Sequence, residues 1–260
     1  MKFCSLFSGS SGNATFIGNE HEGILIDAGK SAKLITLGLQ SIGVEPSAVK
    51  AVFVTHEHSD HVSGLRVFCN KNKIPVYATG GTLEALDSVG KLDGDFPIFQ
   101  ISNFADIGDF HIECFHTSHD VNDPVCYTVL LPNLTKTAVM TDTGVVTEEA
   151  HDGIMGSKII LLESNHDEGM VATGPYPYSL KRRVLGPFGH LSNDAAANLA
   201  VELLERGTEH FILGHLSQEN NLPELAYQTT LSRLTMEGAE LSKDFMLGVA
   251  PRHDILVVEV

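Results

Sequence analysis

A run of metal-binding residue types stands out in the segment AVFVTHEHSDH, residues 51–61. Its apolar, strand-like start leads directly into His56, His58, Asp60 and His61. In an extended segment, residues i and i+2 face the same side, so His56 and His58 can reach one metal ion. After a turn, Asp60 and His61 can reach a second ion. Imidazole and carboxylate ligands together suit Zn²⁺, Mn²⁺ or Fe²⁺, so the segment predicts part of a dinuclear metal site.

Further candidate ligands follow other strand-like runs. ECFHTSHD offers His116 and His119, TAVMTDTG offers Asp142, and HFILGHLS offers His215. We prefer His119 over His116 because it lies on the loop beyond the strand, and His116 stays the alternative. A carboxylate can bridge two cations about 3.5–4 Å apart, so Asp142 is expected to be shared. The two expected ligand sets are His56, His58, His119 and Asp142, and Asp60, His61, Asp142 and His215.

The elements that must position these residues alternate between strands and helices. Strand-like apolar runs are KFCSLF, ATFIG, GILIDAG, AVFVT, PVYAT, FPIFQI, HIECF, CYTVLL, TAVMT, KIILLE, HFILG, FMLGV and ILVVEV. Helical patterns cover residues 31–42, 61–72, 81–90, 147–156, 192–206 and 222–238. Ser192 or Asn193 is the expected N-cap of the fifth. This alternation predicts a layered fold of the α/β (α+β) class.

Composition limits the class of protein. Apolar residues make up 43% of the chain and charged residues 19%, which favours a folded core over disorder. The 33 acidic against 17 basic residues exclude a protein that coats nucleic acid by bulk attraction, but not a local basic patch. The four cysteines have no CxxC pairing and are expected to be reduced, without a disulfide partner. Since no apolar run approaches the ~20 residues of a membrane span, we expect a cytoplasmic protein with no membrane partner.

The motif HEHSDH, followed by His119, Asp142 and His215, resembles the metallo-β-lactamase superfamily. The resemblance extends over essentially the whole chain and implies a four-layer αββα sandwich. It also implies two divalent metal ions, Zn²⁺ or Mn²⁺ with iron as a further option, at one edge of the sheets. Only 47 residues separate Asp142 from His190, too few for an inserted β-CASP domain. We therefore expect a single domain over residues 1–260.

Three further segments narrow the resemblance. ESNHD, GPYPYSLKRRVLGPFGHLSN and ILGHLSQENN look most like the YycJ/WalJ/VicX group of metal-dependent exonucleases, which is related to ribonuclease Z and RNase J. That group is described as acting on DNA from 5′ to 3′. The resemblance therefore implies a phosphodiester hydrolase that uses a metal-bridging hydroxide.

One histidine outside both ligand sets is expected to act in catalysis. His190 lies in a GHLS turn before a helix, and we expect it to assist the leaving group. By resemblance to ribonuclease Z, Glu163 would orient it. Asp60 is counted among the catalytic residues as well as the ligands, and Asp27 is expected to brace the metal loop. The alternatives are a helix-cap role for His190 and a supporting role alone for Glu163.

Cations and aromatic residues ahead of His190 suggest substrate contacts. Lys181, Arg182 and Arg183 fall in a short helical pattern, SLKRRVL, where adjacent residues point about 100° apart. At most two can face the substrate, and we choose Lys181 and Arg182 as phosphate contacts. Tyr178 can stack on an unpaired base, or pack against the neighbouring prolines. The other expected contacts, for which loop packing is the alternative, are Ser10, Asn165 and His166.

The leading functional hypothesis is a DNA 5′-to-3′ exonuclease, with DNA favoured over RNA as the partner. The alternatives are a hydrolase of small phosphodiesters or thioesters, a tRNA-processing endonuclease, and a non-catalytic accessory protein. An oligomer is compatible with the sequence, which does not specify a homodimer. Histidines without supporting context are expected to be surface or packing residues: His21, His111, His151, His210 and His253.

Overall fold

The chain divides into two compact units in the computed structural model, which describes residues 1–252 and 254–260. Unit 1 comprises Met1–Cys114, Val121–Val125 and Pro251–Val260, and unit 2 comprises Phe115–Asp120 and Cys126–Ala250. Each unit is described by itself. The single domain expected over residues 1–260 stays a prediction, and His253 lies outside the described residues.

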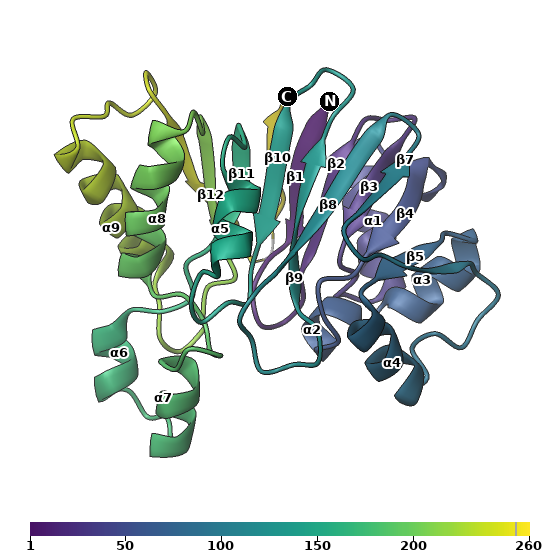
Figure 1. Cartoon of the computed structure of the whole chain (residues 1–260), viewed down its shortest axis with the longest axis horizontal. Coiled ribbons are helices and arrows are strands. Elements are labelled where there is room, and N and C mark those ends of the chain that lie inside the picture. The colour runs from purple at the N-terminus through teal and green to yellow at the C-terminus, as the bar shows by residue number, and fades with distance from the viewer. Residues whose placement is uncertain (253) are drawn as a thin grey trace. The chain divides into compact units, whose positions relative to one another are not determined.

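The first sheet belongs to unit 1 and has the order β14-β1-β2-β3-β4-β5-β6 (Figure 1). Strands β3 to β6 run parallel, whereas β14, β1, β2 and β3 pair antiparallel. Because parallel strands end at the same edge of a sheet, the residues after β3 and β4 come close together. The bounds are β1 Lys2–Phe7, β2 Ala14–Gly18, β3 Gly23–Ile26, β4 Val49–Phe53, β5 Val76–Ala78, β6 Ile98–Gln100 and β14 Leu256–Glu259.

Short helices accompany the first sheet. Leu39 of α1 and Phe68 of α3 are fully buried in one apolar cluster with the strand residue Val52. The helices are α1 Ala32–Ser41, α2 Ser59–Val62, α3 Leu65–Asn72 and α4 Gly80–Ser88, with a 3₁₀ turn at Pro46–Ala48.

The helix predicted over 61–72 is wrong as a single element, because the chain breaks before α3. Gly64 donates its N–H to the carbonyl of Ala28 at 2.9 Å, not to the preceding helical turn. A Cβ at Gly64 would lie 1.9 Å from the carbonyl oxygen of Lys30. This close approach requires glycine and ends α2 before α3 begins.

The second sheet has the order β13-β12-β11-β10-β9-β8-β7. Strands β10 to β13 are parallel, so their carboxyl ends share one edge. The predicted strand runs are all present, but β7 was missed. Its residues are only partly buried, so no continuous apolar run marks it. The bounds are β7 Phe104–Ile107, β8 Phe110–His116, β9 Val125–Leu130, β10 Lys136–Met140, β11 Ile159–Glu163, β12 His210–Gly214 and β13 Met246–Val249.

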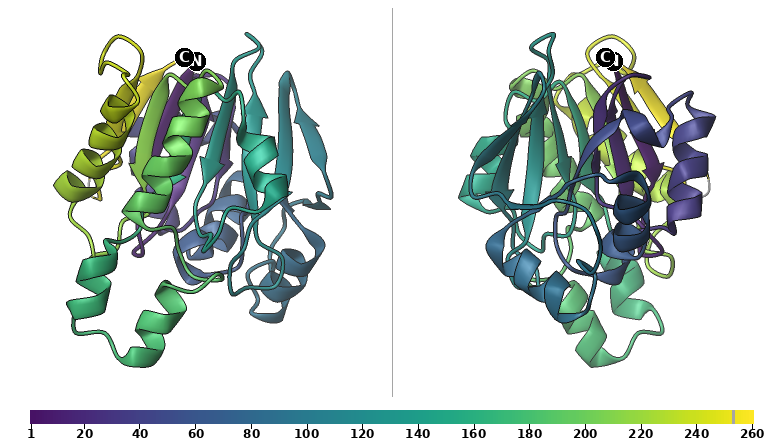
Figure 2. Two further views of the ribbon diagram at one scale, coloured as in Figure 1. Left: turned by 60° about the vertical axis from the view of Figure 1, so that its left-hand side comes forward. Right: turned by 90° about the vertical axis from the view of Figure 1, so that its right-hand side faces the viewer.

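Four helices of unit 2 form two pairs. Helices α8 and α9 pack side by side, and Ser192 caps α8 by accepting a hydrogen bond from Ala195 N at 3.2 Å. Helices α6 and α7 lie next to each other, away from the strands (Figures 1 and 2). The bounds are α5 Glu148–Ile154, α6 Glu168–Thr173, α7 Tyr178–Val184, α8 Asn193–Glu205 and α9 Pro223–Met236.

The cysteines and the membrane prediction can be compared directly with the structure. The four thiols are buried, and no disulfide links them within the chain. Burial raises the pKa of Cys4 and of Cys69 to about 12. Among the described residues, no helix is both long and apolar enough to cross a bilayer.

Two leucines of α1 provide a matched test of how unit 1 packs. Leu39 is fully buried and Leu37 is 51% exposed. We predict that Leu39→Ala lowers the free energy of unfolding by about 2–5 kcal/mol because it leaves a cavity, whereas Leu37→Ala lowers it by no more than about 0.5 kcal/mol. Urea denaturation of both variants measures the difference. Equal losses would contradict the orientation of α1.

Candidate functional site

In unit 1, the chain after β4 folds into a compact histidine cluster. His58 stands immediately before α2, which carries Asp60 and His61. The ring centroid of His56 lies 4.8 Å from that of His58 and 4.1 Å from that of His61. His56 and His61 are buried, while His58 and Asp60 are partly exposed. The four candidate ligands of this segment therefore lie together within the unit.

A buried carboxylate, Asp27, orients this cluster. Its Oδ2 lies 2.7 Å from His61 Nδ1, and its Oδ1 accepts a hydrogen bond from Thr55 N at 2.8 Å. The Thr55 hydroxyl also lies 3.0 Å from His56 Nδ1. The carboxylate of Asp27 accepts the Nδ1–H hydrogen bond of His61, so Nε2 is the acceptor nitrogen of this ring. Asp27 thus makes the bracing contact that we expected, and it fixes the tautomer that a metal ligand needs.

The glycine-serine loop, residues 8–13, packs against the same cluster through Asn13. Asn13 N donates to the carbonyl of Asp60 at 2.7 Å, and Asn13 Nδ2 lies 3.0 Å from His61 Nε2. A Cβ at Gly29 would lie 1.7 Å from the Asp60 carbonyl oxygen, so this approach requires glycine. Ser10 lies exposed in the same loop. Sequence reasoning missed Asn13 and Thr55, because their partners become adjacent only when the loops fold together.

In unit 2, three neighbouring parallel strands end at the remaining candidate residues. Asp142 follows β10, Glu163 ends β11 and His215 follows β12. One ligand atom from each of these residues and from His190 can be chosen so that all four lie within 4.8 Å of one another. Asp142 and His215 have left-handed backbones, with φ of 59° and 53°. Such conformations are uncommon for residues other than glycine and cluster at functional sites.

Glu163 is the fully buried centre of this group. Its Oε1 lies 2.8 Å from His190 Nδ1 and 3.0 Å from His215 Nδ1. Its Oε2 accepts hydrogen bonds from Thr143 N at 2.9 Å and Leu191 N at 3.3 Å. Burial alone would raise the pKa of Glu163, but the His190 charge and the two histidine hydrogen bonds outweigh it and lower the pKa to about 2. The ionised carboxylate accepts both Nδ1–H groups and turns each Nε2 away from itself.

The structure separates the two histidines of HTSH. His119 is buried, its Nδ1 lies 2.9 Å from the carbonyl oxygen of Gly189, and its Nε2 lies 3.8 Å from Asp142 Oδ1. His116 is exposed at the end of β8, with Nδ1 3.1 Å from Glu149 Oε1. The carbonyl acceptor places the His119 proton on Nδ1, so Nε2 offers its lone pair beside Asp142. This geometry favours His119 as a ligand.

The three consecutive cations point in different directions. Lys181 donates to the carbonyl of Ala172 at 2.7 Å, and the Arg182 side chain is exposed. Arg183 instead binds both carboxylate oxygens of Asp120, at 2.5 and 2.9 Å. Asp120 Oδ1 in turn lies 3.5 Å from His119 Nε2. Arg183, which our choice of substrate contacts passed over, is therefore the cation tied to the ligand loop. Only the position of Asp120 directly after His119 hinted at this.

The other expected substrate contacts differ in exposure. Asn165 is 5% exposed, and its Nδ2 donates to the carbonyl of His215 at 2.8 Å. His166 is 1% exposed, and burial lowers its pKa. These two side chains shape the loop after β11, whereas Tyr178 is 77% exposed.

The donor atoms in each unit fit a divalent metal ion. Both clusters combine imidazole nitrogens with carboxylate oxygens, the ligand types that zinc and manganese accept. In each cluster, a buried acid or a carbonyl holds Nδ1–H of a histidine, which is how ligand histidines are commonly oriented. Each cluster by itself therefore has the chemistry of a metal site.

Comparison with known proteins identifies the family. Residues 8–215 match the family model of the metallo-beta-lactamase superfamily. The chain is 36% identical over 247 residues to exodeoxyribonuclease YycJ of Bacillus anthracis, covering 94% of this chain and 93% of that protein. It is also 36% identical over 248 residues to exodeoxyribonuclease WalJ of Streptococcus pneumoniae serotype 2, covering 94% and 92%.

The solved structures agree on the fold. The crystal structure of the metallo-beta-lactamase fold protein YhfI from Bacillus subtilis matches 99% of both chains with a TM-score of 0.73, at 12% identity. This likeness confirms the predicted fold class, an α/β metallo-β-lactamase fold with two sheets and helices. The chain therefore belongs to the metallo-β-lactamase superfamily and, within it, to the group that contains YycJ and WalJ.

Proposed function

We propose that this chain is a dinuclear-metal-dependent exonuclease that degrades DNA from the 5′ end. Family membership makes it a metal-dependent hydrolase, as the sequence predicted. The observation that carries the finer proposal is the buried Glu163 carboxylate, which holds His190 beside Asp142 and His215. The name exodeoxyribonuclease, borne by both relatives over nearly their full lengths, supports DNA as the substrate.

The proposed metal ligands follow from the sequence resemblance. Bound Zn²⁺ or Mn²⁺, with iron as a further option, would supply an activated water nucleophile and offset negative charge at phosphorus. The proposed ligands are His56, His58, His119 and Asp142 for one ion, and Asp60, His61, Asp142 and His215 for the other.

His190 is proposed to supply the proton for the departing oxygen. Its Nδ1 is held by Glu163 at 2.8 Å, so Nε2 faces away from the carboxylate. The side chain is 15% exposed, which lets a substrate reach it while its position stays fixed. As the P–O bond breaks, the leaving oxygen would take the proton from Nε2 of protonated His190, and Glu163 would stabilise that protonated imidazole. Glu163 acts here as a positioning residue, not as a proton donor.

Residues outside the metal clusters are proposed to bind the DNA strand. Lys181 and Arg182 would contact phosphates, Tyr178 would stack on an unpaired base, and Ser10 would contact the backbone. Asn165 and His166 are buried, so their proposed part is to shape the loop after Glu163.

The first prediction concerns the substrate. Two DNA samples are prepared, one labelled at the 5′ end and one at the 3′ end. With Mn²⁺ or Zn²⁺ supplied, the purified protein should release the 5′ label before the 3′ label. Gel analysis of the two separately labelled DNAs measures the polarity. Bis-p-nitrophenyl phosphate serves as a small-ester control. Turnover of the ester with no degradation of DNA would contradict the nuclease proposal and favour a small-phosphodiester hydrolase.

The second prediction separates the catalytic histidine from the ligands. His190→Ala should keep the wild-type metal content and lower kcat about 10²–10⁴-fold, because only proton transfer is lost. Asp142→Ala should lose metal, because it removes a shared ligand. Elemental analysis of both variants gives the metal content. Loss of metal from His190→Ala would show that His190 is a ligand.

The third prediction tests whether Glu163 acts through His190. Glu163→Gln should lower kcat about 10–100-fold, a loss typical for a residue that orients another. Combined with His190→Ala, it should cause little additional loss, because the two residues act as one unit. Steady-state kinetics of the two single variants and the double variant measure the coupling. Losses that multiply would assign Glu163 a role independent of His190.

A further inference from the structure

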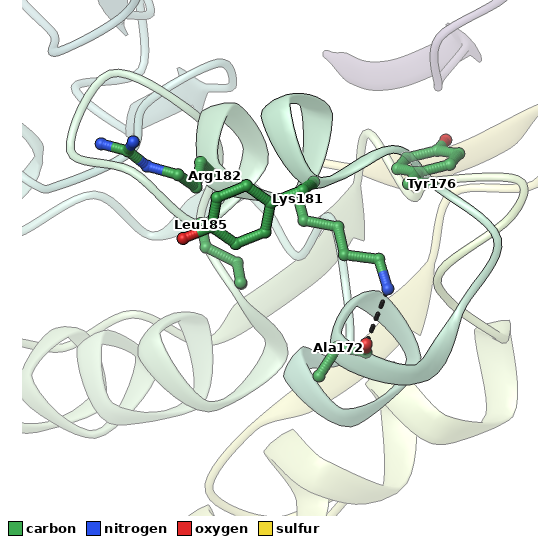
Figure 3. A pocket seen from close by; sticks show the side chains of 6 residues that line it. Ala172, Tyr176, Lys181, Arg182 and Leu185 are labelled. Carbon is green, nitrogen blue, oxygen red and sulfur yellow. Dashed lines mark hydrogen bonds between the residues drawn. The ribbon is translucent and has the colours of Figure 1, made fainter.

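A pocket of 540 Å³ opens between α6 and α7 in unit 2. Figure 3 shows the Lys181 side chain running from α7 to α6, where its ammonium group bonds to the Ala172 carbonyl, while the Arg182 guanidinium extends to the opposite side. Its volume falls within the range of small-ligand sites. The lining residues are Ala172, Tyr176, Tyr178, Lys181, Arg182 and Leu185.

The lining combines flat aromatic rings with positive charge. Tyr178 is 77% exposed and Leu185 is 47% exposed, so apolar surface faces the solvent at this point. The hydrogen bond from Lys181 to Ala172 links α7 to α6 and leaves the ammonium group two further N–H donors. Among the described residues, none forms a hydrogen bond or an ion pair with the Arg182 side chain.

The basic residues that line the pocket favour a negatively charged ligand. The chain as a whole carries a formal net charge of −16, yet two of its 17 basic residues line this one pocket and no acidic residue does. The adjacent Arg183 is neutralised by Asp120, so the uncompensated charge lies on the pocket side of α7. A ligand that offers both a planar ring and a negative charge satisfies this lining, and a nucleotide offers both.

We infer that this pocket binds an unpaired nucleotide of the substrate strand, away from the bond that is cleaved. The base would stack on Tyr178, its phosphate would bind Arg182, and Lys181, which points toward α6, would bind a neighbouring phosphate. This inference rests on the proposed DNA exonuclease function and adds a preference for single-stranded or frayed ends. A blunt duplex would have to unpair before its strand could enter the pocket.

The number of residues between the pocket and His190 sets the largest distance that can separate the pocket from this proposed catalytic residue. Leu185 precedes His190 by five residues, which span at most about 18 Å. His190 N also donates to the carbonyl of Val184 at 3.2 Å, so the end of α7 lies beside the His190 backbone. A stacked strand advances about 3.4 Å per nucleotide, so at most about five nucleotides separate the two places, and a strand of about ten nucleotides can reach both.

Equilibrium binding tests the pocket without turnover. We would measure the fluorescence anisotropy of labelled oligothymidylate of about ten nucleotides in the presence of a metal chelator. Tyr178→Ala and Arg182→Ala should each weaken binding at least about fivefold, whereas Tyr178→Phe should bind like the wild type, because it keeps the ring. The controls are Met236→Ala and Lys243→Ala, which remove an exposed apolar and an exposed cationic side chain outside the pocket. Wild-type binding by both pocket variants would overturn the inference.

A competition experiment tests the identity of the occupant. Unlabelled oligothymidylate should displace the labelled strand, and an oligoglutamate peptide of similar charge should not, because it has no planar ring to stack. Equal displacement by the peptide would indicate a general anion site and overturn the nucleotide assignment.

Turnover distinguishes failure of this inference from failure of the proposed function. The pocket variants should raise KM for single-stranded DNA at least about fivefold, whereas the control variants Met236→Ala and Lys243→Ala should keep the KM of the wild type. If the wild type degrades DNA and the pocket variants match it, only the pocket assignment fails. If the wild type hydrolyses the ester but neither binds nor degrades DNA, both proposals fail.

Discussion

The candidate site of unit 2 depends on one buried charge, the carboxylate of Glu163. Burying an ion is costly unless hydrogen bonds replace its water, and here two imidazoles and two backbone N–H groups do so. Removing any one donor would leave a buried charge partly unsatisfied. The same bonds that stabilise Glu163 therefore fix the orientation of His190 and His215 and position the backbone at Thr143 and Leu191.

Unit 1 uses the same physical arrangement around Asp27. This acid also follows a parallel strand, is buried, and binds Nδ1 of a histidine whose Nε2 is then available to a metal. Asp27, Asp142 and His215 share left-handed backbones, one or two residues after the ends of their strands. In both units, the candidate metal-binding residues lie where parallel strands end. A sharp turn follows the strand, and a buried acid orients the imidazole rings.

The segment of α7 links several functions within unit 2. Lys181 ties it to α6, Arg183 ties it to Asp120, and the carbonyl of Gly189 accepts a hydrogen bond from His119 Nδ1. Ser118 Oγ also donates to the carbonyl of Pro187 at 2.8 Å. The segment that lines the pocket between α6 and α7 is thus bonded directly to the loop that carries His119.

The sequence by itself determined the fold class and the strand runs and singled out the candidate ligand segment around His56, because these depend on local spacing and periodicity. It could not decide between His116 and His119, or which of the three cations is tied to the ligand loop. Those choices depend on partners far along the chain: Gly189 lies 70 residues from His119, and Asp120 lies 63 residues from Arg183. Local patterns record which residues can bind a metal or a phosphate, whereas only the folded backbone brings the carbonyls and carboxylates that orient them within hydrogen-bond distance.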